Sequence, residues 1–427
     1  MYDEKIADLV KAEEERQREG LELIPSENYV SRQVLEAAGS VFTNKYSEGY
    51  PGKRYYGGQD FTDKAEELAI ERAKKLFRAD HANVQPHSGA NANNAVYFAW
   101  LKPGDTVLGL DLGHGGHLTH GAPVTQSAQI YNFINYKIAN VETGEFDYAG
   151  IEKMAKEHKP QIILVGYSAY SRVPDFKRVA AIAKKVVPEC MLMADMAHVA
   201  GLIAAGEHPN PLDDGFHVMT TTTHKTLRGP RGGLILSMGK AGNPLKSVEK
   251  TLENIPTLID RAVFPGTQGG PLMHTIAAKA VSFHEALQPE FKDYAKQIKK
   301  NAAVLADELK KRGFKLVFGG TENHLILVDV KASFGIDGKE FEGALDKIGL
   351  NLNANSIPDD PLPKFRPSGV RLGTPAVTTR GLKEKDMTKI ADWMKRALEA
   401  RNDEKELKKL KSEVVSFAMK FPLPSDK

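Results

Sequence analysis

The chain has 427 residues, of which 41% are hydrophobic and 26% charged, and its formal net charge is +3. This length can bury a sizeable core in two or three domains. The near balance of acidic and basic residues argues against nucleic acid or an anionic membrane as the main partner.

Cysteine use and the N-terminal residues bear on the compartment. The single cysteine, Cys190, excludes an intramolecular disulfide, and we expect it to be a buried structural thiol rather than a nucleophile. The first 20 residues are rich in Glu, Lys and Arg and show no signal-peptide or transit-peptide composition. No stretch approaches the roughly 20 apolar residues that span a bilayer. A cytoplasmic protein is predicted.

The N-terminal segment, to about residue 55, is predicted to form an amphipathic helix followed by an irregular arm. Residues 47–58 contain three Tyr, four Gly and one Pro, a composition that is incompatible with a regular helix. A Tyr- and Gly-rich loop of this kind can line a binding site or simply pack on the surface. The composition leaves both interpretations open.

From about residue 63 onward, helical patterns alternate with short apolar segments. The expected helices include 65–77, 148–157 and 176–187. The expected strands of this part cover 106–110, 161–165, 191–194, 217–220 and 233–236. Strands separated by helices of this length predict βαβ units and a mostly parallel sheet, with ligands bound beyond the carboxyl ends of the strands.

A long helical stretch after Pro271 leads into a smaller C-terminal α+β unit. Its expected strands lie near 316–318, 324–330 and 370–372, and its expected helices at 339–348 and from 383 onward. The sequence therefore predicts an α/β protein with three parts. These are a helix and arm (1–55), a large domain with a mostly parallel central sheet (56–280), and a connecting helix with a small α+β domain (281–427).

The most informative stretch ends a predicted strand with four threonines, 220–223, and continues into His224 and Lys225. A lysine in a turn is usually just solvated. Here Arg228, Arg231 and partial desolvation would favour the neutral amine. A neutral amine is what imine formation with an aldehyde cofactor requires.

A second stretch is the apolar run 191–194, which ends at Asp195 with His198 three residues further on. A carboxylate at the end of a strand can pair with the protonated pyridine nitrogen of pyridoxal phosphate (PLP). It can equally cap the next helix. An aspartate about thirty residues before a turn lysine is the order expected of a PLP enzyme with this kind of sheet.

Two further stretches could bind anions. Residues 87–93 form a small-residue turn that opens a helix, and the Ser88 hydroxyl with free backbone N–H groups could hold a phosphate or merely cap the helix. The chain has neither a P-loop motif nor a dinucleotide-binding glycine fingerprint. Arg371 lies in an apolar strand between Gly369 and Gly373, where it could bind a substrate carboxylate or form a structural ion pair.

A glycine-rich loop places His114, His117 and His120 at three-residue spacing. Such a cluster could ligate zinc, but the loop does not align the rings on one helix face, and Asp111 is the sole carboxylate nearby. An imidazole lying flat against a cofactor ring is the favoured interpretation. We expect no metal.

Together these stretches resemble the serine hydroxymethyltransferases, PLP-dependent enzymes of fold type I. The Thr-Thr-Thr-Thr-His-Lys-Thr run and the three-histidine loop are the most specific motifs, and the resemblance covers nearly the whole chain. Further matching segments are 23–28, 44–52, 54–58, 85–89, 195–198 and 264–271.

The resemblance implies a set of residues around the cofactor. Lys225 would hold PLP as a Schiff base, Asp195 would pair with the pyridinium nitrogen, and His117 would stack on the ring. His198 would approach the ring hydroxyl. The supporting contacts would be Ser168 and Thr222.

The resemblance also implies phosphate, substrate and subunit contacts. The phosphate would be held by Ser88 and Gly89, joined from a neighbouring subunit by Tyr46, Gln268 and Gly270. The amino-acid carboxylate would be held by Ser26, Tyr56 and Arg371. Glu48 would be the acid/base residue near the serine hydroxyl and the pterin.

The implied reaction is the reversible conversion of serine and tetrahydrofolate to glycine and 5,10-methylenetetrahydrofolate. It is a transferase reaction of one-carbon metabolism and of glycine and amino-acid biosynthesis, carried out by a homodimer or a dimer of dimers with shared active sites.

Ala354 stands where family members commonly carry a lysine, which leaves open that the enzyme uses a different tetrahydropterin. The alternative is a folate-independent aldolase acting on threonine or other β-hydroxy amino acids. A binding protein on an inactive scaffold is disfavoured because Lys225 is present.

Overall fold

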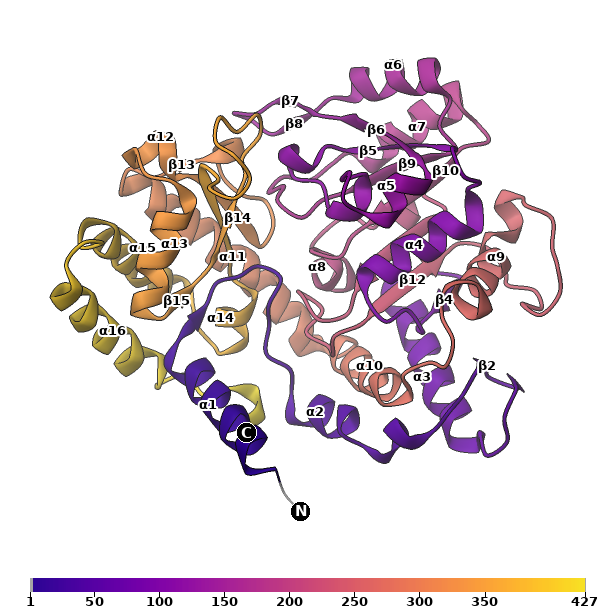
Figure 1. Ribbon diagram of the computed structural model, residues 1–427, viewed down its shortest axis with the longest axis horizontal. Helices are drawn as coiled ribbons and strands as arrows, with labels where there is room; N and C mark the ends of the chain where they lie inside the picture. Colours follow the sequence, from indigo (N-terminus) through magenta and orange to yellow (C-terminus); the bar gives the residue numbers. More distant parts are fainter. Residues whose placement is uncertain (1–2, 427) are drawn as a thin grey trace. The chain divides into compact units, whose positions relative to one another are not determined.

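In the computed structural model, which describes residues 3–426, the chain forms two compact units (Figure 1). The small unit joins the residues up to Tyr29 with those from Lys296 onward, and the large unit runs from Val30 to Ala295. The domain boundaries expected near residues 55 and 280 both fall inside the large unit. Helix α11 (Pro289–Lys311) begins in the large unit and ends in the small one.

A seven-stranded sheet forms the centre of the large unit. In spatial order its strands are β4 (His81–Asn83), β12 (Gly233–Ser237), β11 (Val218–Thr222), β10 (Met191–Asp195), β9 (Ile162–Gly166), β5 (Thr106–Leu110) and β6 (Asn132–Tyr136). The run from β11 to β6 is parallel, whereas β12 is antiparallel to both of its neighbours. Strands β9 to β12 are buried along their whole length, as expected for strands covered on both faces. The predicted α/β class with a mostly parallel sheet is confirmed.

Amphipathic helices supply the layers of this unit. Helix α7 shows the pattern: it buries Phe176, Val179, Ile182 and Ala183 on one face, and the side chain of Asp175 caps its first turn. Helices α6 and α7 pack against each other, as do α3 and α10 (Figure 1). The helices of the large unit are α2 (Arg32–Ala38), α3 (Asp60–Phe77), α4 (Gly89–Trp100), α5 (Gln126–Ile130), α6 (Tyr148–His158), α7 (Phe176–Val186), α8 (Ala200–Ala204), α9 (Ile255–Arg261) and α10 (Met273–Ala286).

Two short hairpins complete the large unit. One pairs β2 (Gly49–Tyr50) with β3 (Lys53–Arg54), so the Tyr- and Gly-rich segment is a hairpin rather than a helix, as its composition predicted. The other pairs β7 (Ile138–Asn140) with β8 (Glu145–Phe146).

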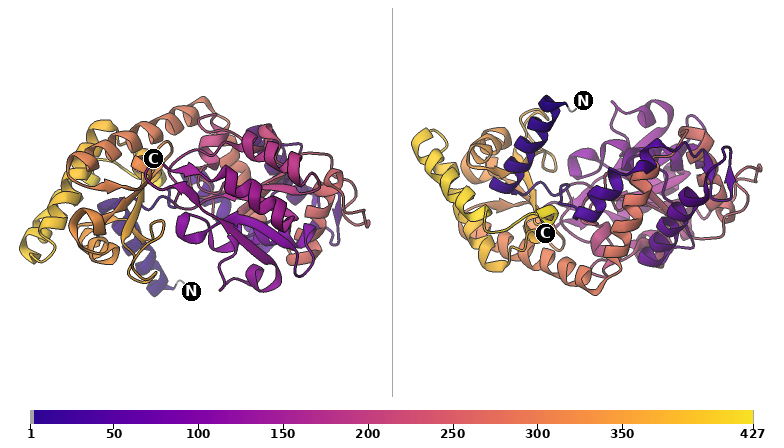
Figure 2. Two further views of the ribbon diagram at one scale, coloured as in Figure 1. Left: turned by 90° about the horizontal axis from the view of Figure 1, so that it is seen from above. Right: turned by 90° about the horizontal axis from the view of Figure 1, so that it is seen from below.

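The small unit is built on an antiparallel sheet. Its strands, in spatial order, are β13 (Lys315–Leu316), β14 (Leu325–Asp329), β17 (Gly369–Gly373) and β16 (Asn353–Asn355). A separate pair joins β1 (Leu21–Glu22) to β15 (Leu350–Asn351) in parallel. Besides α11, the helices are α1 (Glu4–Glu19), α12 (Val330–Phe334), α13 (Gly338–Ile348), α14 (Pro375–Thr379), α15 (Glu384–Glu399) and α16 (Glu404–Ala418). Helices α1 and α16, indigo and yellow in Figure 2, pack together.

Two local differences from the sequence-based expectations have physical causes. The strand expected at 316–318 ends at Leu316, because Phe318 adopts a left-handed backbone (φ 60°). The apolar pattern does not predict strand β6, because it lies at the edge of the sheet and carries the exposed Asn132 and the partly exposed Asn135. Among residues 3–426 no helix combines the length and apolarity that a membrane span needs.

Candidate active site

The carboxyl ends of the parallel strands bring most of the predicted cofactor residues to one edge of the large sheet. Asp195 is the last residue of β10 and lies in register with Gly166 of β9 and Thr220 of β11. The loop after β5 carries the histidines, and Ser168 follows β9. Lys225 follows β11 by three residues. Alignment of parallel strands therefore gathers groups that are far apart in sequence, as the general rule for such sheets requires.

Asp195 is buried and accepts three hydrogen bonds. Its Oδ2 accepts from Asn93 Nδ2 (2.8 Å) and His120 Nε2 (3.0 Å), and its Oδ1 accepts from the backbone N–H of Ala197 (3.2 Å). Burial alone would raise the pKa of Asp195, but the hydrogen bonds from His120 and Asn93 help to hold that pKa below its usual value. These hydrogen bonds thus favour the ionised form of a carboxyl group at the end of a central strand.

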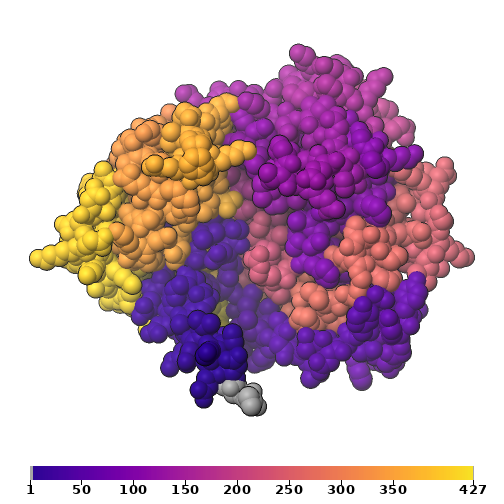
Figure 3. All heavy atoms as spheres, viewed as in Figure 1, coloured from indigo at the N-terminus to yellow at the C-terminus, as the bar shows by residue number. Residues whose placement is uncertain are grey.

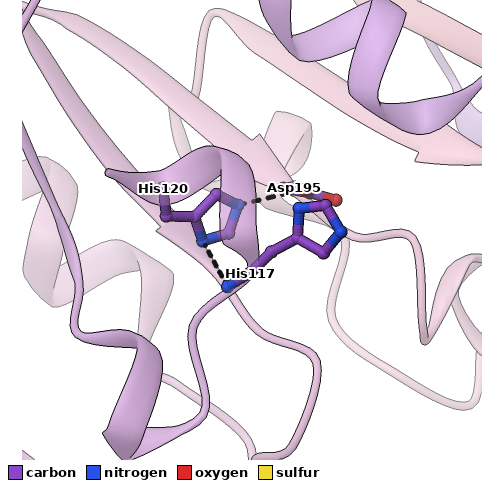
Figure 4. Close-up of side chains that lie close together, drawn as sticks. All are labelled: His117, His120 and Asp195. Atoms are coloured by element: carbon purple, nitrogen blue, oxygen red, sulfur yellow. Dashed lines mark hydrogen bonds and ion pairs between the residues drawn. The ribbon is translucent and has the colours of Figure 1, made fainter. Parts of the chain in front are cut away.

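His117 and His120 form a rigid pair beside this carboxylate (Figure 4). The Nδ1 atom of His120 accepts from the backbone N–H of His117 (3.1 Å), so the proton of a neutral His120 lies on Nε2, which faces Asp195. The Nδ1 atom of His117 accepts from the Thr119 N–H (3.2 Å). The two rings meet edge to face with centroids 5.7 Å apart. This network fixes both the position and the tautomer of His120.

The third histidine of the loop lies elsewhere. His114 is buried, and its Nδ1 accepts from the backbone N–H of Ile138 at 3.4 Å. Potential ligand atoms of His117, His120 and Asp195 do lie within 4.8 Å of one another. In this structure, hydrogen bonds link Asp195 to His120 and His120 to the backbone of His117. These bonds orient the Asp195 carboxylate.

Lys225 lies in a buried turn between β11 and β12. Its backbone carbonyl accepts from Arg228 N (3.0 Å), and the turn is closed by a bond from Gly229 N to Thr223 O (2.7 Å). Next to it, burial and, to a smaller extent, the charges of Arg231 and Lys225 lower the pKa of His224 to about 3. The lysine therefore lies in an electropositive turn that is largely shielded from water.

Threonine side chains connect this turn to the end of β10. The hydroxyl of Thr226 donates to His198 O (2.9 Å) and accepts from Gly201 N (2.9 Å). The hydroxyl of Thr222 donates to Ala197 O at 3.3 Å. The segment that carries Asp195 and His198 is thereby held to the segment that carries Lys225.

The predicted phosphate turn begins α4. The Ser88 hydroxyl accepts from Asn91 N (3.3 Å) and donates to Asn91 Oδ1 (2.8 Å), so it is the N-cap of a helix of 12 residues. A Cβ atom at Gly89 would lie 2.8 Å from Thr222 Cγ2. The missing side chain thus lets the first turn of α4 approach the end of β11, where its free N–H groups can receive an anion.

A second group of predicted residues surrounds the Tyr- and Gly-rich hairpin. Tyr46 and Tyr56 are about half exposed and meet edge to face with centroids 5.3 Å apart. The Tyr46 hydroxyl donates to Glu48 Oε1 (3.3 Å), and the tyrosine ring lies against Gly270. Gln268 binds the backbone of the phosphate turn in its own chain, accepting from His87 N (3.1 Å) and donating to the carbonyl of Gln85 (3.0 Å).

Ser26 and Arg371 belong to the small unit. Arg371 lies in β17 between β14 and β16, and its Nε donates to Asn353 Oδ1 (3.1 Å). Burial lowers the pKa of Arg371 to about 10, so the guanidinium remains charged at neutral pH. Ser26 follows Leu23, whose carbonyl accepts from the N–H of Gly373 at 2.7 Å. The segments that carry Ser26 and Arg371 are therefore hydrogen-bonded to each other within this unit, whereas Tyr56, the third predicted carboxylate-binding residue, belongs to the large unit.

Sequence reasoning missed two residues of the carboxylate network. His120 was noticed in the three-histidine loop, but no contact with Asp195 was expected. Asn93 joins the network on α4, where its amide also donates to Thr119 Oγ1 (2.8 Å) and its carbonyl accepts from Thr220 Oγ1 (2.6 Å). The signal that the sequence offers for Asn93 is its position, one turn into the helix that starts at the phosphate turn.

The site offers one group for each part of PLP. The buried carboxylate suits the ring nitrogen, the imidazole pair suits the ring face, the turn lysine suits the aldehyde, and the helix N-terminus suits the phosphate. Fold and site thus define a PLP-type α/β enzyme. The model of the serine hydroxymethyltransferase family matches residues 1–394. A serine hydroxymethyltransferase from Alkalilimnicola ehrlichii is 52% identical over 422 residues, which cover 99% of this chain and 97% of that protein.

The chain therefore belongs to the serine hydroxymethyltransferase family. This assignment confirms the predicted fold class and the predicted activity, a transferase reaction that interconverts serine and glycine with tetrahydrofolate. Neither comparison favours the folate-independent aldolase.

Proposed function

We propose that the edge of the large sheet binds PLP, with Lys225 as the covalent anchor and Asp195 as the partner of the ring nitrogen. The observation that carries this proposal is the buried Asp195 carboxylate, which His120 and Asn93 keep ionised and oriented. When bound, PLP supplies a protonated pyridine ring that accepts the electron pair released as the serine Cα–Cβ bond breaks. An ionised Asp195 keeps the proton on that ring nitrogen.

The remaining residues of this edge would position the cofactor. His117, which the Thr119 N–H holds in place, would lie on the face of the ring, and His198 would approach the ring hydroxyl. Ser168 and Thr222 would support the ring from the ends of their strands. The Ser88 hydroxyl and the N–H groups from Gly89 onward would hold the phosphate.

The amino acid would be bound through its carboxylate. Arg371 is a charged group in a buried strand, and its planar guanidinium can form a bidentate pair with a carboxylate. Ser26 would donate a further hydrogen bond, and Tyr56 would contribute its hydroxyl. Each of these groups would contribute to holding the carboxylate of the serine.

Glu48 would move the proton of the serine hydroxyl as the one-carbon unit passes to tetrahydrofolate. Its carboxylate is held by the Tyr46 hydroxyl and lies against Gly269. Tyr46, Glu48 and Gly270 thus lie together, consistent with their acting together on the active site of a neighbouring subunit, whereas the side chain of Gln268 binds the phosphate turn of its own chain.

A homodimer is supported by apolar side chains that the large unit leaves exposed. Several come from the segment between residues 35 and 68, which reaches the surface in Figure 3. Val41 is 80% exposed, Phe61 74% and Tyr55 61%. Exposed apolar side chains that come from one segment are groups that another chain could cover. We further propose that the enzyme is cytoplasmic, as the single buried cysteine suggests.

The cofactor assignment is tested by titrating the purified protein with PLP and recording its visible absorbance. Wild type and a Lys153→Ala control on the exposed face of α6 should both develop a band, and Lys225→Ala should not. Addition of glycine and tetrahydrofolate together should change the wild-type spectrum further. Absence of a band in wild type would refute the PLP site, and an equal band in Lys225→Ala would refute the anchor.

The shared site is tested by mixing two inactive variants, Lys225→Ala and Glu48→Gln. In a dimer with shared sites, a mixed dimer has one site in which both residues are intact. Random subunit exchange would then restore about a quarter of wild-type activity. If each chain supplies both residues to its own site, mixing restores nothing.

A further inference from the structure

A buried lysine outside the predicted site lies directly beneath the phosphate turn. Lys279 of α10 is 1% exposed, and its Nζ donates to Val84 O (2.7 Å), Pro86 O (3.1 Å) and Gly233 O (2.7 Å). Val84 and Pro86 belong to the segment that leads from β4 into Ser88. The lysine therefore joins the start of the phosphate turn to the first residue of β12.

The geometry requires a protonated amine. Three carbonyl acceptors use three N–H donors, which an ammonium has and a neutral amine lacks. Burial lowers the pKa of Lys279 to about 7, so the loss of water opposes the charged form that these acceptors require. Glu66 attracts the charge over a longer range, but its own hydrogen bonds go to Arg54 and Gln85.

This charge acts on both sides of the cofactor site. It adds to burial in lowering the pKa of His87, the residue before Ser88. Together with burial, Arg231 and Lys225, it also lowers the pKa of His224, the residue before the turn lysine. The ammonium thus lies near the phosphate turn on one side and the Lys225 turn on the other.

Close packing makes the position of this turn depend on Lys279. The N–H of Gly233 donates to Pro86 O (2.9 Å), and a Cβ atom at Gly233 would lie 2.3 Å from Ser88 O. Gln268, a few residues before α10, binds the carbonyl of Gln85 and the N–H of His87. Side chains from this one segment therefore hold the backbone polar groups from Val84 to His87.

We infer that Lys279 is a positioning residue for the cofactor phosphate. It fixes the turn that presents Ser88 and Gly89, and its buried positive charge attracts the phosphate dianion through the turn. The inference rests on the PLP site proposed above. In return, a bound phosphate would provide the buried ammonium with the counter-charge that its backbone contacts do not supply.

The test compares PLP with pyridoxal, which has the same ring and aldehyde but no phosphate. Dissociation constants are measured by absorbance for the full-length apoenzyme and for Lys279→Met, which keeps an unbranched side chain one atom shorter and removes its charge and donors. The preference of the protein for PLP over pyridoxal should fall by about tenfold or more, since a unit charge is removed from a low-dielectric site. A purely structural role would weaken both ligands alike.

Two further variants control for folding. Lys279→Gln keeps two N–H donors without the charge and should show an intermediate loss. Ile276→Val, buried on the same helix, should keep the wild-type preference. As a second readout, inorganic phosphate should raise the melting temperature of wild-type apoenzyme and of Ile276→Val more than that of Lys279→Met.

The outcomes separate the two proposals. A wild-type protein that does not bind PLP refutes the cofactor site itself. A wild-type protein that binds PLP, with an unchanged PLP-to-pyridoxal preference in Lys279→Met, refutes the role of Lys279 alone. If neither Lys279 variant folds, the residue belongs to the fold, and the inference is overturned as well.

Discussion

Replacement of His120 by phenylalanine should weaken the cofactor site without abolishing it. The substitution keeps a ring of similar size and removes the Nε2 donor that lies 3.0 Å from Asp195 Oδ2. A hydrogen bond to a charged group contributes about 1.5–3 kcal/mol. Asp195 keeps two donors, Asn93 Nδ2 and the N–H of Ala197, so the carboxylate stays in place.

That loss corresponds to a decrease of about tenfold to a hundredfold in PLP affinity and in kcat/KM for serine cleavage. The backbone N–H of His117 loses its acceptor as well, which should lower the free energy of unfolding by about 1–3 kcal/mol. The assays are absorbance titration with PLP, serine turnover with tetrahydrofolate, and urea unfolding.

His114→Phe is the matched control, because His114 is a buried histidine of the same loop whose Nδ1 accepts from Ile138 N rather than facing Asp195. It should lose stability and keep PLP affinity within about twofold of wild type. A His120→Phe variant that binds PLP as tightly as wild type, or an equal loss of affinity in both variants, would refute a role of the His120–Asp195 hydrogen bond in cofactor binding.

Three other substitutions or treatments follow from burial and charge. Burial raises the pKa of Glu22 to about 8, with a further contribution from Glu27, so the folded chain holds a proton that the unfolded chain has already released above about pH 5. The free energy of unfolding should therefore fall as pH rises toward 8, by up to about 1.4 kcal/mol per pH unit. Glu22→Gln keeps the acceptor for the Ile24 N–H and should flatten this dependence, as measured by urea unfolding at pH 5.5 and 7.5. The same pH dependence in wild type and Glu22→Gln would contradict this prediction. Burial also raises the pKa of the Cys190 thiol to about 12, so a thiol reagent should modify it only after unfolding, and rapid modification of native enzyme would disprove its burial. Arg371→Lys should raise KM for serine by about a hundredfold, because lysine cannot form a bidentate pair with the carboxylate, and an unchanged KM would remove Arg371 from the substrate site.

The sequence by itself determined the framework of the large unit. Apolar runs separated by helical patterns correctly predicted strands near 106–110 and 191–194, which the structure gives as β5 and β10. This succeeds because strands buried on both faces need continuous apolar residues, which are visible locally. Asp195 at a strand end and Lys225 in a turn could be recognised for the same reason: their chemistry contrasts with the apolar segments next to them.

Only the tertiary structure decided which groups surround these residues. Asp195 binds His120 across 75 residues and Asn93 across 102, and neither spacing has a signature in the sequence. Lys279 is harder still to predict, because its three acceptors are backbone carbonyls, which every residue possesses. Local patterns reveal burial and turns, whereas the hydrogen bonds that orient a carboxylate or hold a turn depend on where distant segments meet.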